Sequence, residues 1–376
     1  ENSSDSGSGT SSNTVSGYVQ KGPFIQGTVI TVWELDSSLV QTGRTFIGTI
    51  DDNTGTFNAR GNVVSPYVEL SAVGYYFNEV SGSLSTAPLT LQALSDLNDN
   101  SSVNVNLMTH LEKKRVEYLI DAGSTFTTAK SQAQTEIMKI FNIENVSLGS
   151  SETLDISKSG DGNAVLLAIS AILQSDKTEA ELTELLSTIN TDIRTDGTLD
   201  STTTKATLVT AMEYLKTRHI ANTSIRTNIE SRYSNLGVSV TIPAFESYAY
   251  KLDTTAPTVD NSSPYNCNCT LSPTLDFSVT FSEIMDATTI TTNTSDTSCS
   301  GTFQVSSDNF ATCAEMTGLS FTISDSYKTF TLDRSESYQS DGIIDGQLTY
   351  KFRVTSGATD LAGNSVSMTA IDIRFN

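Results

Sequence analysis

The sequence is poor in the residues that most often carry catalysis. Its 376 residues include two histidines and one tryptophan. A Ser-His-Asp or Cys-His arrangement needs a histidine, but His110 and His219 both fall in segments that read as helices, and no G-x-S-x-G elbow is present. Glycine-rich phosphate-binding loops are missing as well. The residue inventory therefore predicts a protein that is not an enzyme.

Positive charge is also scarce. The chain has 22 Lys and Arg against 43 Asp and Glu, a net charge of −21. Such a chain is repelled by the phosphates of nucleic acids and by anionic lipid headgroups. No apolar run approaches the roughly 20 residues that span a bilayer. We therefore expect no nucleic-acid partner and no transmembrane segment.

Charged residues make up only 17% of the chain and hydrophobic residues 37%, so hydroxyl and amide side chains cover much of the surface. This composition is typical of secreted, β-rich bacterial proteins. Residues 1–15 contain almost nothing to bury and predict a flexible tether. A tether of this kind follows the acylated cysteine of bacterial lipoproteins. We therefore expect membrane attachment only through a lipid anchor upstream of Glu1, at the bacterial outer membrane or cell surface.

Cysteine is absent from the first two thirds of the chain, and all four cysteines lie between Cys267 and Cys313. Structural zinc usually needs CxxC-type knuckles, so disulfides in an oxidising compartment are the favoured interpretation. Cys299 with Cys313 is the preferred pair, because the segment between them reads as a strand and its return. Pairing Cys267 with Cys269 makes a strained ring, so the crossed connectivities stay open.

Residues 16–107 alternate in short segments separated by turns, which predicts six or seven strands of a β-sandwich. The glycines at 17, 22 and 27 and the segment TIDDNTGTF at 49–57 resemble the carboxypeptidase-regulatory, Cna-B and transthyretin-like group. This resemblance implies a prealbumin-like sandwich that serves as a spacer or stalk.

Over residues 108–235 the apolar residues take the spacing that is typical of helices. Thr109 and Glu112, and again Thr178 and Glu181, have the spacing of a capping box. The segment NAVLLAISAIL is apolar almost all round and predicts a central, buried helix. Five or six helices make a bundle, which is similar to the helical region after such sandwiches in bacterial surface lipoproteins. Residues 236–256 read as an extended connector.

Residues 257–376 return to strand and turn patterns. The segment VTFSEIMD at 279–286, the residues around Asp253 and Pro257, and the run from Tyr350 to Asn364 resemble the bacterial Ig-like module of S-layer and spirochaete surface proteins. The resemblance implies an Ig-like β-sandwich. The fold class predicted for the whole chain is thus multidomain α+β, with a sandwich, a helical bundle and an Ig-like sandwich in that order.

Several carboxylates invite comparison with functional sites. Glu283 and Asp286 are expected to accept backbone N–H groups where a strand ends, and the aromatic cleft of a glycosidase is not evident around them. Asp155 and Asp161 lie in a loop that lacks the bidentate Glu of an EF-hand. With Asp341 and Asp345 they are at most weak calcium sites, and we expect no other cofactor.

The sequence favours a cell-surface lipoprotein that acts as an adhesin-like binding protein or a spacer. Its partner would be an extracellular protein or matrix ligand. Two other functions stay open: a structural subunit of a surface layer or filament, which binds copies of itself through Ig-like edges, and an accessory protein for carbohydrate binding.

Overall fold

The structure is a computed structural model of the whole chain. It describes residues 13–99, 102–220, 223–263, 276–333, 349–367 and 369–374. The chain divides into two compact units, residues 1–252 and 253–376.

The first unit is built on a seven-stranded sheet with the strand order β8-β5-β2-β3-β4-β1-β9. Neighbouring strands are antiparallel except for β1 and β9, which are parallel. The strands are β1 (Asn13–Gln20), β2 (Val29–Leu35), β3 (Gln41–Ile50), β4 (Thr56–Gly61), β5 (Tyr67–Gly74), β8 (Leu89–Asp96) and β9 (Val105–Asn106). A small hairpin of β6 (Phe77–Asn78) and β7 (Ser83–Leu84) stands apart from the sheet.

Alternating side chains explain why these segments form strands. Along β2, Ile30 and Val32 are fully buried, whereas Val29, the first residue of the strand, is 42% exposed. This two-residue period places one face of the strand in the core and the other toward solvent. The seven strands confirm the β-sandwich predicted for the N-terminal end, which the structure builds as a sandwich or barrel-like sheet.

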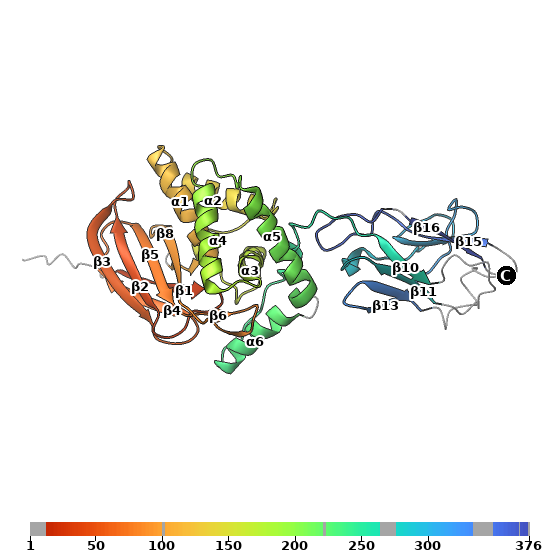
Figure 1. Cartoon of the computed structure of the whole chain (residues 1–376), viewed down its shortest axis with the longest axis horizontal. Helices are drawn as coiled ribbons and strands as arrows, with labels where there is room; N and C mark the ends of the chain where they lie inside the picture. The colour runs from red at the N-terminus through yellow and green to blue at the C-terminus, as the bar shows by residue number, and fades with distance from the viewer. Residues whose placement is uncertain are drawn as a thin grey trace, which may run out of the picture. The chain divides into compact units, whose positions relative to one another are not determined.

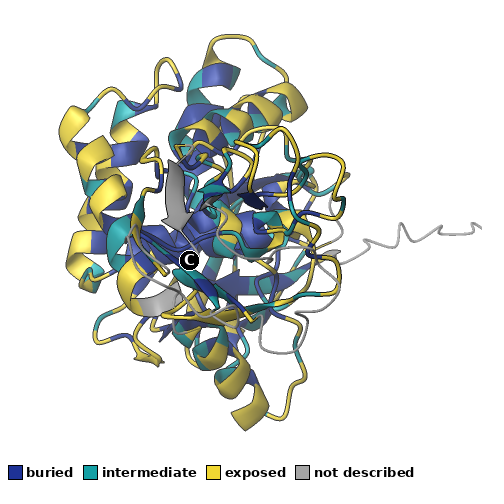
Figure 2. Cartoon of the chain, turned by 90° about the vertical axis from the view of Figure 1, so that its right-hand side faces the viewer, coloured by how far each residue is buried: buried dark blue, intermediate teal, exposed yellow. Residues whose placement is uncertain are grey.

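The helices of the first unit lie on one side of this sheet (Figure 1). Their bounds are α1 (Leu107–Asp121), α2 (Phe126–Ile140), η1 (Ser151–Thr153), α3 (Asp161–Gln174), α4 (Glu179–Asp192), α5 (Thr202–Leu215), η2 (Lys216–Ile220), α6 (Ser224–Asn235) and α7 (Glu246–Ala249). Helix α3 is buried from Ala164 to Gln174, as its apolar sequence predicts. The other helices turn their exposed faces outward (Figure 2).

The sheet and the helices share one compact unit, although the sequence pattern treats 16–107 and 108–235 as two domains. The physical reason is a shared apolar core. Leu35 and Leu94 of the sheet form one buried cluster with residues of α1 and α2, namely Val116, Leu119, Ala129 and Ala133. Neither layer could bury these side chains alone. Strand β1 also begins at Asn13, inside the range predicted as tether.

The second unit begins at Asp253, four residues before the predicted start at 257. It has a four-stranded sheet, β10-β11-β14-β13, and a three-stranded sheet, β12-β15-β16. The elements are β10 (Val259–Ser263), β11 (Phe277–Phe281), η3 (Ala287–Thr289), β12 (Phe303–Ser306), β13 (Phe321–Ser324), β14 (Thr329–Leu332), β15 (Thr349–Val354) and β16 (Thr369–Arg374). Stacked and edge-on phenylalanines fill the core, among them Phe277, Phe303, Phe330 and Phe352. The two sheets and this core confirm the predicted Ig-like sandwich.

No helix in the described part of the chain combines the length and the apolar character that crossing a membrane requires.

Candidate functional site

The first unit contains a cavity of about 360 Å³ beside helix α2. One wall is the α2 face that carries Phe126, Lys130 and Gln134, and the other is the segment 148–152. The cavity is lined by Asp99, Phe126, Thr127, Lys130, Ser131, Gln134, Leu148, Gly149, Ser150, Ser151 and Glu152. It has the size of a small-molecule site.

A buried cluster of charges lies at this cavity. Lys130 Nζ is 2.5 Å from Glu112 Oε2 and 3.1 Å from Glu152 Oε1. The side chain of Glu112 is fully buried, that of Glu152 is 1% exposed, and that of Lys130 is 11% exposed. One ammonium group is therefore shared by two carboxylates that solvent hardly reaches.

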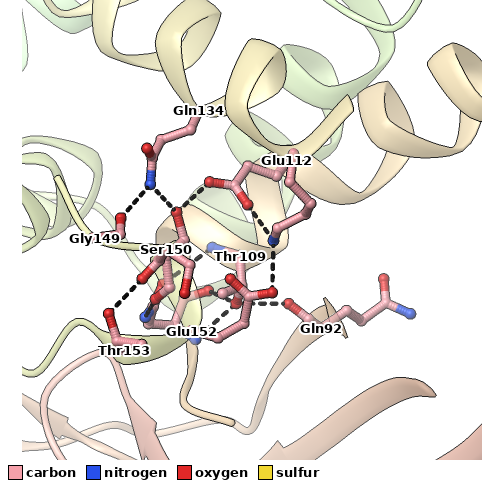
Figure 3. Close-up of polar contacts among 11 residues, drawn as sticks. Gln92, Thr109, Glu112, Gln134, Gly149, Ser150, Glu152 and Thr153 are labelled. Atoms are coloured by element: carbon pink, nitrogen blue, oxygen red, sulfur yellow. Dashed lines mark hydrogen bonds and ion pairs between the residues drawn. The ribbon is translucent and has the colours of Figure 1, made fainter. Parts of the chain in front are cut away.

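Three elements position these groups. Glu112 lies on the buried face of α1, Lys130 lies on α2, and Glu152 lies in the short helix η1. Figure 3 shows Glu112 and Gln134 turned toward the segment from Gly149 to Thr153. Ser151 Oγ donates a hydrogen bond to Glu112 Oε1, and Gln134 Nε2 donates to both Ser151 Oγ and the Gly149 carbonyl, each at 2.9 Å. The side chains thus hold the loop against both helices.

Two hydrogen bonds to backbone carbonyl groups fix the same segment. Asn106 Nδ2 donates to the carbonyl oxygen of Ser151 at 2.8 Å, while Asn106 also caps helix α1. The N–H of Asn104 donates to the carbonyl oxygen of Glu152 at 2.8 Å. Because η1 is tied to the start of α1 in two places, Glu152 is held at one position relative to Lys130.

Burial sets the electrostatics of the cluster. It raises the pKa of Glu112, since the charged form is poorly solvated there, although the nearby Lys130 opposes that rise. Burial alone would lower the pKa of Lys130, but Glu112 and Glu152 outweigh it, and the pKa of Lys130 is raised. Lys130 therefore stays charged at neutral pH.

One atom of the cluster has no protein partner. Glu152 Oε2 is buried and accepts no hydrogen bond from any residue that the structure describes. A buried carboxylate oxygen without a donor costs free energy. The arrangement is therefore suited to binding a group that brings a hydrogen-bond donor into the cavity.

A second cluster consists of carboxylates only and lies within the C-terminal unit. Asp253, Glu283 and Asp360 are all buried, and one oxygen atom of each lies within 4.8 Å of the others. Three carboxylates are fewer than the roughly six to eight oxygen ligands that calcium takes. Among the described residues, this is the single place where three or more His, Cys, Asp or Glu side chains lie close enough together to hold a metal ion.

Hydrogen bonds assign this second cluster a role in the fold. Asp360 Oδ1 accepts from the N–H groups of Gly363 and Asn364 at 2.7 and 2.8 Å. Asn364 Nδ2 donates to Asp360 Oδ2 at 2.9 Å and to the carbonyl oxygen of Asp253 at 3.0 Å. The contacts of Asp360 therefore close the turn 360–364, and Asn364 connects this turn to the first residue of the unit.

The residues that the sequence singled out lie elsewhere. Asp155 Oδ1 accepts from Gln20 Nε2 and from the N–H and hydroxyl of Ser157, at 2.6–2.9 Å. Asp161 is exposed at the first position of α3. Neither belongs to the metal-type group found in the described part of the chain. Asp341 and Asp345 lie outside the described residues, so calcium at these four positions stays a prediction.

The turn residue Asp286 behaves as the sequence predicts. Its Oδ1 accepts from the N–H and the hydroxyl of Thr288, at 2.9 and 2.7 Å, and so caps the helix η3. Glu283 is buried and lies close to Asp253 and Asp360, and its acceptance of backbone N–H groups stays a prediction.

The structure contains the disulfide Cys299–Cys313, with Cα atoms 4.9 Å apart. Cys267 and Cys269 lie outside the described residues.

Sequence reasoning missed the cluster of Glu112, Lys130 and Glu152. Glu112 was assigned to a capping box, and Glu152 lies in a loop that no periodic pattern marks. The one available signal was Lys130 on α2, since a lysine that faces a core needs a buried partner.

Comparison with known proteins identifies the C-terminal unit. Residues 253–376 match the family of bacterial Ig-like domains, Big_5. The C-terminal unit is a bacterial Ig-like domain. A comparison with curated protein sequences gave no significant match.

Among solved structures, the chain is similar to one titled "Structure of surface layer protein SbsC, domains 1-6". The sequence identity is 15% and the TM-score 0.22, over 72% of this chain and 32% of that chain. The chain therefore spans about a third of that structure's length.

Proposed function

We propose that this protein is a non-enzymatic protein of the bacterial cell surface that acts as a spacer and presents its first unit to an extracellular ligand. The observation that carries the proposal is the bacterial Ig-like domain at 253–376. The hydroxyl-rich composition and the net charge of −21 support it, because both keep a protein soluble outside the cell. The Cys299–Cys313 disulfide fits the same oxidising location.

The proposal includes a lipid anchor on a cysteine upstream of Glu1. Residues 1–12, which lie outside the described part of the chain, contain no aliphatic or aromatic side chain, a composition that suits a spacer between the first unit and the membrane. The anchor would be the means of membrane attachment.

Protease treatment of intact cells that produce the full precursor tests the surface location. We expect external protease to cleave the chain while a cytoplasmic marker stays intact. Metabolic labelling with an alkyne fatty acid tests the anchor, and the label is expected at a cysteine upstream of Glu1. A chain that is fully protected in intact cells but cleaved after lysis would contradict the surface location.

A second candidate function is self-assembly through strand edges, and strand β3 favours it. Gln41 and residues 45–49 of β3 pair with β2, whereas only Thr49 and Ile50 pair with β4. Arg44 is the one charged residue in β3, and Ile47 is 67% exposed. An edge with so little charge is a template for pairing with another strand.

Light scattering over a range of protein concentrations tests this second candidate. Assembly through β3 predicts a mass that rises with concentration and a variant, Ile47→Lys, that stays monomeric. Val209→Lys is the matched control, because Val209 is exposed on helix α5 instead. A wild-type monomer at every concentration would contradict self-assembly.

A further inference from the structure

We propose that the cavity between α2 and the segment 148–152 binds one neutral sugar residue, as the recognition site for a glycan. This inference deepens the proposed binding role and rests on it. The hydrogen-bonding capacity, the charge and the apolar lining of the cavity support it.

Glu152 and Lys130 both line the cavity, the first with a hydrogen-bond acceptor and the second with a donor. Glu152 Oε2 is buried and has no hydrogen-bond donor among the residues that the structure describes. The ammonium of Lys130 has three N–H groups, and the carboxylates of Glu112 and Glu152 take two of them in the described part of the chain. A sugar hydroxyl both donates and accepts, so two adjacent hydroxyls satisfy both groups at once.

The charge of the site selects against other ligands. Glu112 and Glu152 outnumber Lys130, and Asp99 adds a further exposed carboxylate at the lining. This excess of negative charge repels phosphate, sulfate and nucleotides. A metal ion at Glu152 would lie close to the ammonium of Lys130, which repels it. A neutral polyhydroxyl ligand meets neither penalty.

The remaining lining suits the apolar face of a sugar ring. Phe126 is half-buried and is held by Tyr67, whose ring centroid is 5.3 Å away. Leu148 is half-buried on the opposite segment. Small-molecule sites combine such aromatic and aliphatic surfaces with a few fixed polar groups. The volume of about 360 Å³ accommodates one ring and its substituents.

The loop that forms one wall is already fixed by the protein. Gln134, Asn106 and Asn104 hold residues 149–152 by hydrogen bonds of 2.8–2.9 Å. A site that is formed before the ligand arrives loses less entropy on binding. This preorganisation favours measurable affinity for a ligand as small as one sugar residue.

Ligand-detected NMR titration of the full chain tests the proposal. The probes are the methyl glycosides of glucose, galactose, mannose and N-acetylglucosamine, with glucose 6-phosphate as the anionic control. We expect saturable binding of at least one glycoside and none of the phosphate. Glu152→Gln removes the orphan carboxylate oxygen and is expected to weaken binding about tenfold, or about 1.4 kcal/mol.

Two further variants separate the site from the fold. Ser131 is exposed and lines the cavity, so Ser131→Tyr fills it while Glu112, Lys130 and Glu152 are all retained. We expect this variant to lose binding and to keep the wild-type melting temperature. Thr135→Tyr is the matched control, because Thr135 is exposed on the same helix but does not line the cavity. It should bind as the wild type does.

Three results would overturn the proposal. They are the absence of saturable binding by every glycoside, undiminished binding by Ser131→Tyr, and a crystal structure with saturating glycoside in which only water contacts Glu152 Oε2. None of them affects the surface location, which protease treatment of cells tests independently.

Discussion

Lys21 and Glu79 form a buried ion pair in the first unit, and the charge of Lys21 depends on the groups around it. Both side chains are fully buried. Ser170 Oγ donates to Glu79 Oε1 at 2.9 Å and to the Lys21 carbonyl at 2.8 Å. Burial lowers the pKa of Lys21, although Glu79 opposes the change. The charge of Lys21 in the folded protein therefore depends on Glu79.

The first prediction concerns the loss of that partner. Glu79→Gln leaves the ammonium buried without a counter-charge and should lower the free energy of unfolding by about 3–5 kcal/mol. Urea unfolding, followed by the fluorescence of Trp33, measures the change. Replacing both residues, as Lys21→Met with Glu79→Leu, should recover most of the loss. A double variant as unstable as the single one would show that the pair itself is stabilising.

The second prediction follows from His110, also at the scale of one residue. Burial lowers the pKa of His110 to about 4, and the charges of Lys113 and Lys114 act in the same direction. The unfolded chain takes up this proton near pH 6.5, so it binds more protons than the folded chain between about pH 6.5 and pH 4. The stabilisation is complete above the unfolded pKa and is lost as the pH falls through this window.

Comparison with His110→Gln isolates this effect, because the carboxylates titrate in both proteins. As the pH falls from about 6.5 toward 4, the unfolding free energy of the wild type should decrease relative to the variant by about 1.4 kcal/mol per pH unit. Urea unfolding at a series of pH values provides the measurement. Parallel pH profiles of the two proteins would mean that His110 titrates normally.

At the scale of elements, the sequence predicts helix starts well where the signal is local. Thr178 caps α4 and forms the predicted capping box with Glu181. The box predicted for Thr109 and Glu112 was wrong: α1 begins at Leu107, and Asn106 is its N-cap, with Thr109 as the third residue of the box. Asn106 also ends strand β9, which pairs with β1. A strand pairing across 86 residues fixes this start, and no short pattern reveals it.

The same limit explains the candidate site. The apolar periods indicate α1 and α2, but not which polar residues the two helices turn toward a third segment. Glu152 meets Lys130 only because hydrogen bonds from Asn104 and Asn106 fold residues 149–152 back onto α1. The sequence shows that the chain has Glu112, Lys130 and Glu152. It does not show that they meet, because their meeting depends on contacts between segments that are far apart in the chain.

The third prediction compares the two caps. Thr178→Ala removes an exposed cap and should cost about 1 kcal/mol of unfolding free energy. Asn106→Ala removes a fully buried cap and also the hydrogen bond from Asn106 Nδ2 to Ser151. We expect a loss of about 2–4 kcal/mol, because a buried carbonyl loses its donor as well. Equal losses in urea unfolding would show that the Ser151 contact contributes nothing.

At the scale of the whole molecule, the two compact units should unfold as separate cooperative transitions. Each has its own apolar core: α3 and the curved sheet in the first, and the phenylalanine cluster in the second. Trp33, the only tryptophan of the chain, lies in β2 and reports on the first unit alone. The two transitions can therefore be assigned without dividing the chain.

The fourth prediction uses the disulfide to test this independence. Cys299→Ser with Cys313→Ser opens a loop whose ends are 14 positions apart. Loop-closure entropy then predicts a loss of about 3 kcal/mol, confined to the C-terminal unit. Near-ultraviolet circular dichroism should show that unit melting at a lower temperature, while the Trp33 fluorescence transition stays in place. A shift of the Trp33 transition as well would mean that the Ig-like domain and the helix-covered sheet unfold as one body, and a ligand bound to either unit would then stabilise both.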